Sequence, residues 1–183
     1  MKVIKQPISE VLLFEPQVYP DVRGYFVVTY EKSIFARCGV KDEFTQDNYN
    51  CSEKGVIRGL HYQLPPKAQA KLIRVVKGAV YDVAVDIRKT SPTFGQHVAA
   101  RLSAENKKML FVPKGFAHGF CALEPETEVA YKVSGEYAPD HEGGVYWNDP
   151  ALAIQWPKLD CDYILNDRDS VFPPLAKAEV FEK

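Results

Sequence analysis

Residues 71–87, KLIRVVKGAVYDVAVDI, contain two short apolar runs joined by Lys77 and Gly78. Both runs are rich in valine and isoleucine, whose branched side chains favour the extended backbone of a strand. A glycine between two such runs is typical of a turn. The stretch therefore predicts two consecutive β-strands, at 71–76 and 79–87.

Similar runs occur on both sides of this stretch, separated by turn sequences such as LPPK, SPTFG and LEPE. Only residues 31–39, EKSIFARCG, have a helical pattern, with Gly39 as the expected C-terminal cap. The last segment, residues 173–183, is expected to be irregular with a short helix. Many short strands with one or two short helices favour an all-β fold, an antiparallel β-sandwich of the jelly-roll type. Further strands are expected at 11–16, 24–30, 55–63, 97–102, 108–113, 119–123 and 127–134.

The length and composition are those of one ordinary globular domain, which we expect to span residues 1–183. The net charge of -1 gives no general attraction to nucleic acid or to an acidic membrane. No apolar run approaches the roughly 20 residues of a membrane span, and the first residues lack the apolar segment of a signal peptide. We therefore expect a cytoplasmic protein without nucleic-acid or membrane partners. The cysteines are scattered, as in proteins of a reducing compartment, at Cys38, Cys51, Cys121 and Cys161.

The run GVIRGLHYQ, residues 55–63, places Arg58 and His61 in an otherwise apolar strand. Strict alternation along a strand would put these two side chains on opposite faces. For both to serve one pocket the strand must be bulged, and Gly59 is the position that accommodates a bulge most easily. Taken alone, the segment favours a solvated arginine and a hydrogen-bonded core histidine.

The fragments around His61 and His118 resemble the metal-binding motifs of the cupin superfamily, in which three histidines and a glutamate hold a divalent metal. Here Gln63 occupies the position of the second histidine, and Lys71 lies near the position of the glutamate. Two imidazoles, a neutral amide and an ammonium group do not form a stable site for a divalent cation. The sequence therefore disfavours a metal-dependent cupin oxygenase, and no metal or cofactor is expected.

The same residues suit proton transfer without a metal. A histidine can remove a proton near neutral pH. The ammonium group of Lys71 could stabilise the oxyanion that forms when a carbon next to a carbonyl is deprotonated. A phenol such as Tyr131 could return the proton on the opposite face and so invert the carbon, although Tyr131 considered by itself is typical of a core aromatic residue.

Four long segments resemble the dTDP-4-dehydrorhamnose 3,5-epimerase family, whose members are metal-free cupin-fold enzymes of dTDP-L-rhamnose synthesis. The likeness extends from DVRGYF (21–26) to ILNDRD (164–169). It implies a cupin-type jelly roll, an isomerase that uses no cofactor, and a homodimer in which an N-terminal segment of one subunit completes the other subunit's site. The four segments are QDNYNCSEKGVIRGLHYQLPP (46–66), KLIRVVKGAVYDVAVDIRKTSPTFG (71–95), LSAENKKMLFVPKGFAHGFCAL (102–123) and YWNDPALAIQWP (146–157).

The resemblance also implies a role for each matching residue. His61 matches the catalytic base, and Asp169 matches the aspartate that orients it. Lys71 matches the lysine beside the C4 oxygen of the sugar, and Tyr131 the phenol that returns a proton on the other face. The residues that match the substrate-binding positions are His118 in the active site, Arg23 and Arg58 at the nucleotide diphosphate, and Gln46 and Asn48 near the nucleotide and sugar.

Two positions depart from the family pattern. Val28 stands where members commonly have a glutamate, and Asn50 replaces a frequent serine. These departures leave the nucleotide base open, with a dTDP-linked sugar as the expected substrate. Two alternatives share the same residues or fold: an epimerase that inverts only C3 or only C5 in another nucleotide-sugar pathway, and a non-catalytic sugar-binding jelly roll.

Overall fold

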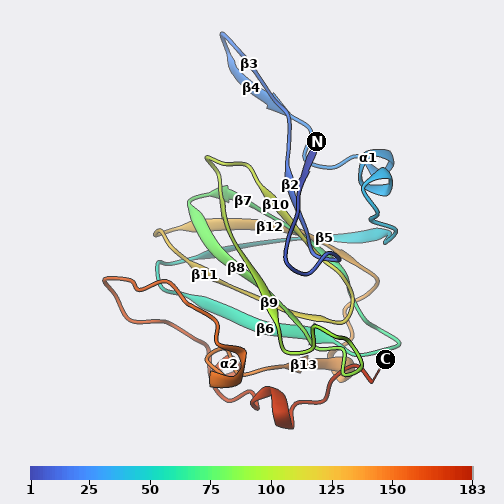
Figure 1. Cartoon of the computed structure of the whole chain (residues 1–183). Coiled ribbons are helices and arrows are strands. Elements are labelled where there is room, and N and C mark those ends of the chain that lie inside the picture. The colour runs from blue at the N-terminus through green and yellow to red at the C-terminus, as the bar shows by residue number, and fades with distance from the viewer. Residues whose placement is uncertain (183) are drawn as a thin grey trace.

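The computed structural model describes residues 1–182, and two antiparallel β-sheets lie face to face in it (Figure 1). The six-stranded sheet has the order β1 (Lys2–Ile4), β2 (Leu12–Glu15), β10 (Met109–Val112), β7 (Lys71–Lys77), β12 (Thr127–Ser134) and β5 (Phe44–Ser52). The five-stranded sheet has the order β13 (Glu142–Gly144), β6 (Ile57–Gln63), β11 (Phe116–Ala122), β8 (Ala79–Asp86) and β9 (His97–Ser103). The predicted all-β sandwich is confirmed.

Helices are few and short, as expected. They are α1 (Lys32–Arg37), which confirms the predicted helix, and α2 (Asp167–Ser170), which was not predicted. Three 3-10 turns follow the last long strand, at Pro139–His141, Pro150–Leu152 and Leu175–Lys177. The third of these turns is the short helix expected in the last segment, of which Lys183 lies outside the described residues. None of the helices in residues 1–182 is long and apolar enough to cross a membrane.

Each predicted strand is present, but the short strands β1, β3 (Val18–Asp21) and β13 and the long strand β5 were not predicted. β5 was missed because its sequence, FTQDNYNCS, is mostly polar and exposed. β5 is the edge of its sheet and pairs with β12 along its whole length, so tertiary pairing and not local propensity makes it a strand. The run predicted at 24–30 is shorter than expected. It ends at Val27 as β4 (Gly24–Val27), which pairs with β3 (Val18–Asp21) in a separate hairpin.

The main core lies between the two sheets. Ile73 and Val129 of the six-stranded sheet pack with Val80, Ala84 and Phe120 of the five-stranded sheet, all at most 4% exposed. Removal of this apolar surface from water holds the sheets together. The sandwich therefore gives a fixed frame in which side chains from two facing sheets can meet.

A second apolar layer lies on the outer face of the five-stranded sheet. There Leu60 and Tyr62 of β6 pack with Leu152, Leu175 and Phe181 of the C-terminal segment. This segment returns across the sheet, and α2 lies beside β6 (Figure 1). As a result, residues near position 169 come close to residues near position 61 although they are far apart in sequence.

Candidate active site

The strand β6 contains a β-bulge. His61 pairs with His118 of β11, whereas Arg58 pairs with Phe120, so three steps along β6 match two steps along β11. Gly59 lies in the bulge with φ +133°, a conformation that favours glycine. A Cβ added to Gly59 would lie 2.5 Å from the Cα of Gly119 on β11. The bulge predicted at Gly59 is therefore confirmed. The close approach of β11 explains why the facing residue, Gly119, is also a glycine.

The bulge changes where Arg58 points. One extra residue cancels the alternation that would otherwise put Arg58 and His61 on opposite faces. The Arg58 guanidinium donates to the Ser52 hydroxyl at 3.0 Å and to the Cys51 carbonyl at 3.1 Å, and both of these residues lie on β5 in the other sheet. Arg58 thus reaches across the sandwich from the strand that also carries His61.

His61 forms a buried pair with Asp169 of α2. Its Nε2 donates to Oδ1 of Asp169 at 2.8 Å, and the aspartate side chain is only 1% exposed. The other carboxylate oxygen accepts the Gly59 N–H at 2.9 Å. Burial alone would raise the pKa of Asp169, but its hydrogen bonds to His61 and Gly59 hold that pKa below its usual value. Asp169 is therefore a carboxylate, and Nδ1 is the His61 nitrogen left free to accept a proton.

Opposing influences act on the charge of His61. Burial lowers its pKa most, Asp169 counteracts this, and the cations Lys71 and Arg168 lower it further. The net direction is down, so the imidazole is neutral at neutral pH. A neutral imidazole with one nitrogen held by a carboxylate is the form that a general base requires.

Lys71 lies next to this pair. Its ammonium group donates to the His61 carbonyl oxygen at 3.3 Å from β7 of the facing sheet. Burial lowers the pKa of Lys71 to about 8, while the negative charges of Asp82 and Glu142 act in the opposite direction. The side chain is thus a cation at neutral pH, held in a partly buried position where its charge has a strong local effect.

His118 belongs to a second histidine–aspartate pair. Its Nε2 donates to Oδ1 of Asp82 at 2.9 Å, with the two side chains 9% and 0% exposed. The other oxygen, Oδ2 of Asp82, is buried and has no hydrogen-bond partner among residues 1–182. Asp82 was not predicted as a site residue, although an acidic residue inside the apolar run AVYDVAVDI was a signal for it.

The remaining predicted residues of the six-stranded sheet lie on β12 and β5. Tyr131 packs against the core between the sheets, so it faces inward as Ile73 does. Asn48 is its partner across the strands, and the Gln46 amide donates to the Asn48 side chain at 2.6 Å. Tyr131 and His61 thus belong to facing sheets, and no hydrogen bond joins them among the described residues.

Arg23 lies elsewhere. It is at the tip of the β3–β4 hairpin, pairs with Asp21 at 2.6 Å, and has a side chain that is 85% exposed. The hairpin extends beyond the sandwich, at the end of the molecule away from α2 and β6 (Figure 1). Within this one chain, the structure does not bring Arg23 to the His61–Asp169 pair.

Gln63 has a structural role that the sequence did not reveal. Its amide donates to the Lys67 carbonyl at 2.7 Å and to the Glu136 carbonyl at 3.1 Å, and its oxygen accepts from the Ala138 N–H at 2.9 Å. The side chain is therefore fully engaged with two loops. No group of three or more His, Cys, Asp or Glu side chains within residues 1–182 is arranged to hold a metal ion.

Three further residues around His61 were missed. Arg168 donates to Glu142 at 2.7 Å and lies 3.4 Å from Nε2 of His61, while the ring of Phe172 meets the imidazole edge-on at 5.7 Å. Their distance in sequence from His61 left no pattern to find, except that Arg168 directly precedes Asp169.

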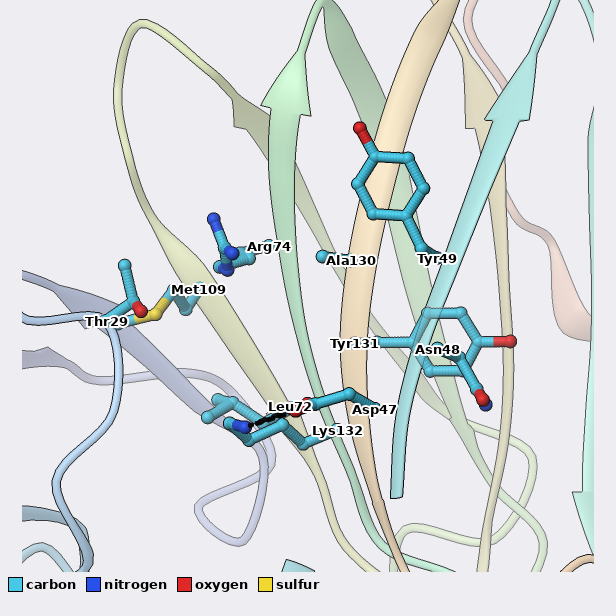
Figure 2. A pocket seen from close by; sticks show the side chains of 10 residues that line it. All are labelled: Thr29, Asp47, Asn48, Tyr49, Leu72, Arg74, Met109, Ala130, Tyr131 and Lys132. Carbon is cyan, nitrogen blue, oxygen red and sulfur yellow. Dashed lines mark hydrogen bonds and ion pairs between the residues drawn. The ribbon is translucent and has the colours of Figure 1, made fainter.

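A cavity of about 280 Å³ lies on the other face of the six-stranded sheet. Figure 2 shows its lining, with Arg74 on β7, Lys132 on β12, and Asn48 and Tyr49 on β5. Leu72, Arg74 and Lys132 alternate along β7 and β12 with the inward-facing Ile73 and Tyr131. The lining contains neither His61 nor Asp169, but it includes two of the predicted site residues, Asn48 and Tyr131.

The comparisons with known proteins agree with one another. The family model described as dTDP-4-dehydrorhamnose 3,5-epimerase matches residues 5–177. A dTDP-4-dehydrorhamnose 3,5-epimerase of Shigella flexneri is 52% identical over 170 residues, which cover 92% of this chain and 93% of that protein.

Two solved structures are also similar. The epimerase of Legionella pneumophila, in complex with dTDP-4-keto-L-rhamnose, has a TM-score of 0.92 and 43% identity, over 96% of this chain and 93% of that one. A 3′-monoepimerase of Streptomyces bikiniensis, in complex with dTDP-quinovose, has a TM-score of 0.87 and 34% identity, over 94% and 87% of the two chains.

Proposed function

The chain belongs to the dTDP-4-dehydrorhamnose 3,5-epimerase family, and on that premise we propose how its residues epimerise dTDP-4-dehydro-6-deoxy-D-glucose at C3 and C5 to dTDP-4-dehydro-L-rhamnose. The observation that carries the proposal is the His61–Asp169 hydrogen bond of 2.8 Å beside the Lys71 ammonium group. Together they supply a base and a cation, which are the two things that removal of a proton next to a ketone requires.

Proton removal begins the reaction. Nδ1 of His61 takes the proton from C3 or C5, the C–H electrons form the enolate, and the negative charge develops on the C4 oxygen. Asp169 stabilises the imidazolium that results, because its carboxylate already accepts the Nε2 hydrogen. Lys71 stabilises the C4 oxyanion, since the ammonium is attracted more strongly to an enolate than to a neutral carbonyl.

Inversion requires a proton from the opposite side. Tyr131 projects inward from the six-stranded sheet, whereas His61 belongs to the five-stranded sheet. A sugar held between the sheets would therefore have the imidazole on one face and the phenol on the other. Tyr131 donates its proton to the enolate carbon, and the carbon is left with inverted configuration.

The nucleotide is held by the polar residues at the open side of the sandwich. Arg58 already has two hydrogen bonds to β5, which orient its guanidinium toward the strand that carries Gln46 and Asn48. A planar guanidinium suits the oxygens of a diphosphate. His118 lies opposite His61 in the strand pairing and is placed to contact the sugar.

The chain functions as a homodimer in this proposal. The exposed hairpin carries Arg23 away from its own His61, and it displays Tyr19, Tyr25 and Phe26, each more than half exposed. Large apolar side chains on a projecting element are typical of a protein–protein contact. The hairpin of one subunit would then bring Arg23 to the diphosphate in the site of its partner.

We place the protein in the cytoplasm. All four cysteines are free, and Cys51 and Cys161 are exposed. A reducing compartment keeps exposed thiols in this form.

Proton NMR of dTDP-4-dehydro-6-deoxy-D-glucose with the enzyme in D2O tests the function. Exchange of the protons at both C3 and C5, with appearance of the L-rhamno product, is the expected result. Exchange and inversion at C3 alone would instead support the second candidate, a monoepimerase like the similar structure from Streptomyces bikiniensis. A sugar-binding module without catalysis would exchange neither proton.

A further inference from the structure

Arg168 is a charged residue beside the His61–Asp169 pair for which the proposed reaction has no role. It lies in the single turn of α2, between Asp167 and Asp169. Its guanidinium nitrogens face three different groups: Nη1 lies 2.7 Å from Oε2 of Glu142, Nε lies 3.6 Å from Oδ1 of Asp169, and Nη2 lies 3.4 Å from Nε2 of His61. One side chain thus connects β13, α2 and β6.

The partner of this guanidinium is itself held in place. Glu142 is on β13, is only 20% exposed at its side chain, and also accepts the Tyr137 hydroxyl at 3.0 Å. β13 pairs with β6 so that Glu142 is opposite Gln63 and Gly144 is opposite His61. Glu142 is therefore fixed to the strand that carries the base, and Arg168 connects α2 to that same strand.

The helix α2 needs such a connection because a helix of one turn is not stable by itself. Its internal support is the Asn166 side chain, which accepts the Asp169 N–H at 2.7 Å. Asp169 also bonds to Gly59 and His61, but those bonds are the ones that catalysis uses and that must have the correct geometry. The Arg168–Glu142 pair is the contact of α2 with the sheet that is independent of the aspartate.

The position of the cation also has an electrostatic consequence. The groups that face His61 are Asp169 and Arg168 on α2, Lys71 on β7 and Glu142 on β13, with the Asp82–His118 pair behind them on β8 and β11. Since Nη2 of Arg168 lies 3.4 Å from Nε2, the guanidinium would repel a positive charge on the imidazole. Arg168 therefore opposes Asp169 and favours the neutral ring.

We propose that Arg168, held by Glu142, is a positioning residue for the base: it fixes Asp169 against Nε2 of His61 and favours the neutral, proton-accepting imidazole between turnovers. This rests on the proposed role of His61 as the base. A lysine could not face three groups at once, because its ammonium is a single point of charge.

The test compares Arg168→Met and Arg168→Lys with the wild-type enzyme. Arg101→Met is the matched control, because Arg101 is similarly exposed and pairs with Glu124 at 3.5 Å on the far edge strand β9. For each protein, kcat, KM and the pH profile of kcat/KM are measured by C3 and C5 exchange, and thermal unfolding is followed in parallel. Wild-type turnover by itself tests the proposed function, whereas the differences between variants test Arg168.

We expect Arg168→Met to lower kcat about tenfold with little change in KM, within the range that positioned acid–base catalysis contributes. Its acid limb of kcat/KM should move up by about half a pH unit, because the ring is protonated more easily without the neighbouring cation. Arg168→Lys should have the acid limb at the wild-type pH, because the positive charge is kept, but its kcat should stay below the wild-type value. Arg101→Met should match the wild type in both.

Two results would overturn the proposal. One is an unchanged kcat and pH profile in Arg168→Met. The other is a loss of activity that follows a lower Tm with no movement of the acid limb, which is the result for a purely structural residue. If Arg168→Met does not fold, Arg168→Lys decides: a lower kcat with an unmoved acid limb at the wild-type Tm supports the proposal, whereas wild-type values, or a loss of kcat that follows a lower Tm, contradict it.

Discussion

Asp169 fixes which nitrogen of His61 is free to act as the proposed base. Its Oδ1 accepts from Nε2 and its Oδ2 from the Gly59 N–H, so both carboxylate oxygens are used and the ring cannot turn without losing a buried bond. This leaves Nδ1 as the proton acceptor. The orientation of the His61 ring therefore depends on a hydrogen bond between two residues that are 108 positions apart in sequence.

His61→Ala should abolish exchange at C3 and C5 without unfolding the protein. A positioned base contributes about 10²–10⁴-fold, and the proposed reaction begins with this base. Exchange in D2O followed by NMR measures the loss, and far-UV circular dichroism checks the fold. A variant that keeps more than a few per cent of the wild-type rate would remove His61 from the role.

Asp82→Asn should move the alkaline limb of kcat to lower pH. Burial holds the pKa of Lys71 at about 8, and the charge of Asp82 is what raises it most against burial. The ammonium form is present below that pKa, so activity falls as the pH rises through it. Without the carboxylate the pKa drops further and activity is lost earlier. A pH–rate profile with the same alkaline limb as the wild type would contradict the coupling of Asp82 to Lys71.

Tyr131→Phe should separate exchange from inversion. The change removes only the hydroxyl group and keeps the ring that packs against the core. His61 could still take a proton and return solvent deuterium to the same face, so deuterium should enter C3 or C5 while little inverted product forms. Epimerisation at the wild-type rate would show that the second proton comes from another group.

At the scale of elements, the site depends on the bulge in β6 and on the close contact of β6 with β11. The bulge could be predicted, since a glycine stands between two polar residues of an apolar strand. The close contact of the bulge with β11 could not be predicted, because the facing glycine, Gly119, lies on another strand. For the same reason α2 was not predicted. Its four residues have no periodic pattern, and it forms because Asn166, Arg168 and Asp169 each have partners in the folded chain.

Gly119→Ala tests the contact between the two strands. A Cβ at position 119 would lie 2.7 Å from the Arg58 carbonyl oxygen and 3.0 Å from the Cα of Gly59. Because both atoms belong to backbone, β6 must shift, and overpacking of this kind typically costs about 1–3 kcal/mol. We expect a lower free energy of unfolding in denaturant titration and a fall in kcat. Wild-type values of both would mean that β6 can move away freely.

The matched control is Gly135→Ala. No atom lies within 4 Å of a Cβ at position 135, so this variant changes a positive-φ glycine (φ +74°) without overpacking the β6–β11 contact. It should lose stability through backbone strain but keep the wild-type kcat.

At the scale of the whole molecule, the sandwich and most of its strands could be predicted from runs of β-branched residues, because these residues face the core. β5 could not, because its polar side chains carry no such pattern, yet it contributes Gln46 and Asn48 to the side of the sandwich proposed to hold the nucleotide. The place of Arg23 could not be predicted either. An exposed turn, DVRG, has the same sequence signature whether it stays in solvent or contacts another subunit.

Co-expression of Arg23→Ala with His61→Ala subunits tests the proposed exchange of hairpins. Each homodimer has two defective sites. In a mixed dimer, one site would combine the intact His61 of one subunit with the intact Arg23 of its partner. Half of the dimers should be mixed, so about a quarter of the wild-type activity should return. No recovery beyond the average of the two parents would mean that Arg23 does not act across the interface.

The C-terminal position of Asp169 has a consequence for the chain during its synthesis. A protein emerges from the ribosome in order from its N-terminus. All the strands of both sheets, the last of them β13 at Glu142–Gly144, are synthesised before α2 at Asp167–Ser170. The His61–Asp169 pair can therefore form only after every strand of the two sheets has been synthesised. A chain interrupted before α2 would lack the carboxylate that orients His61.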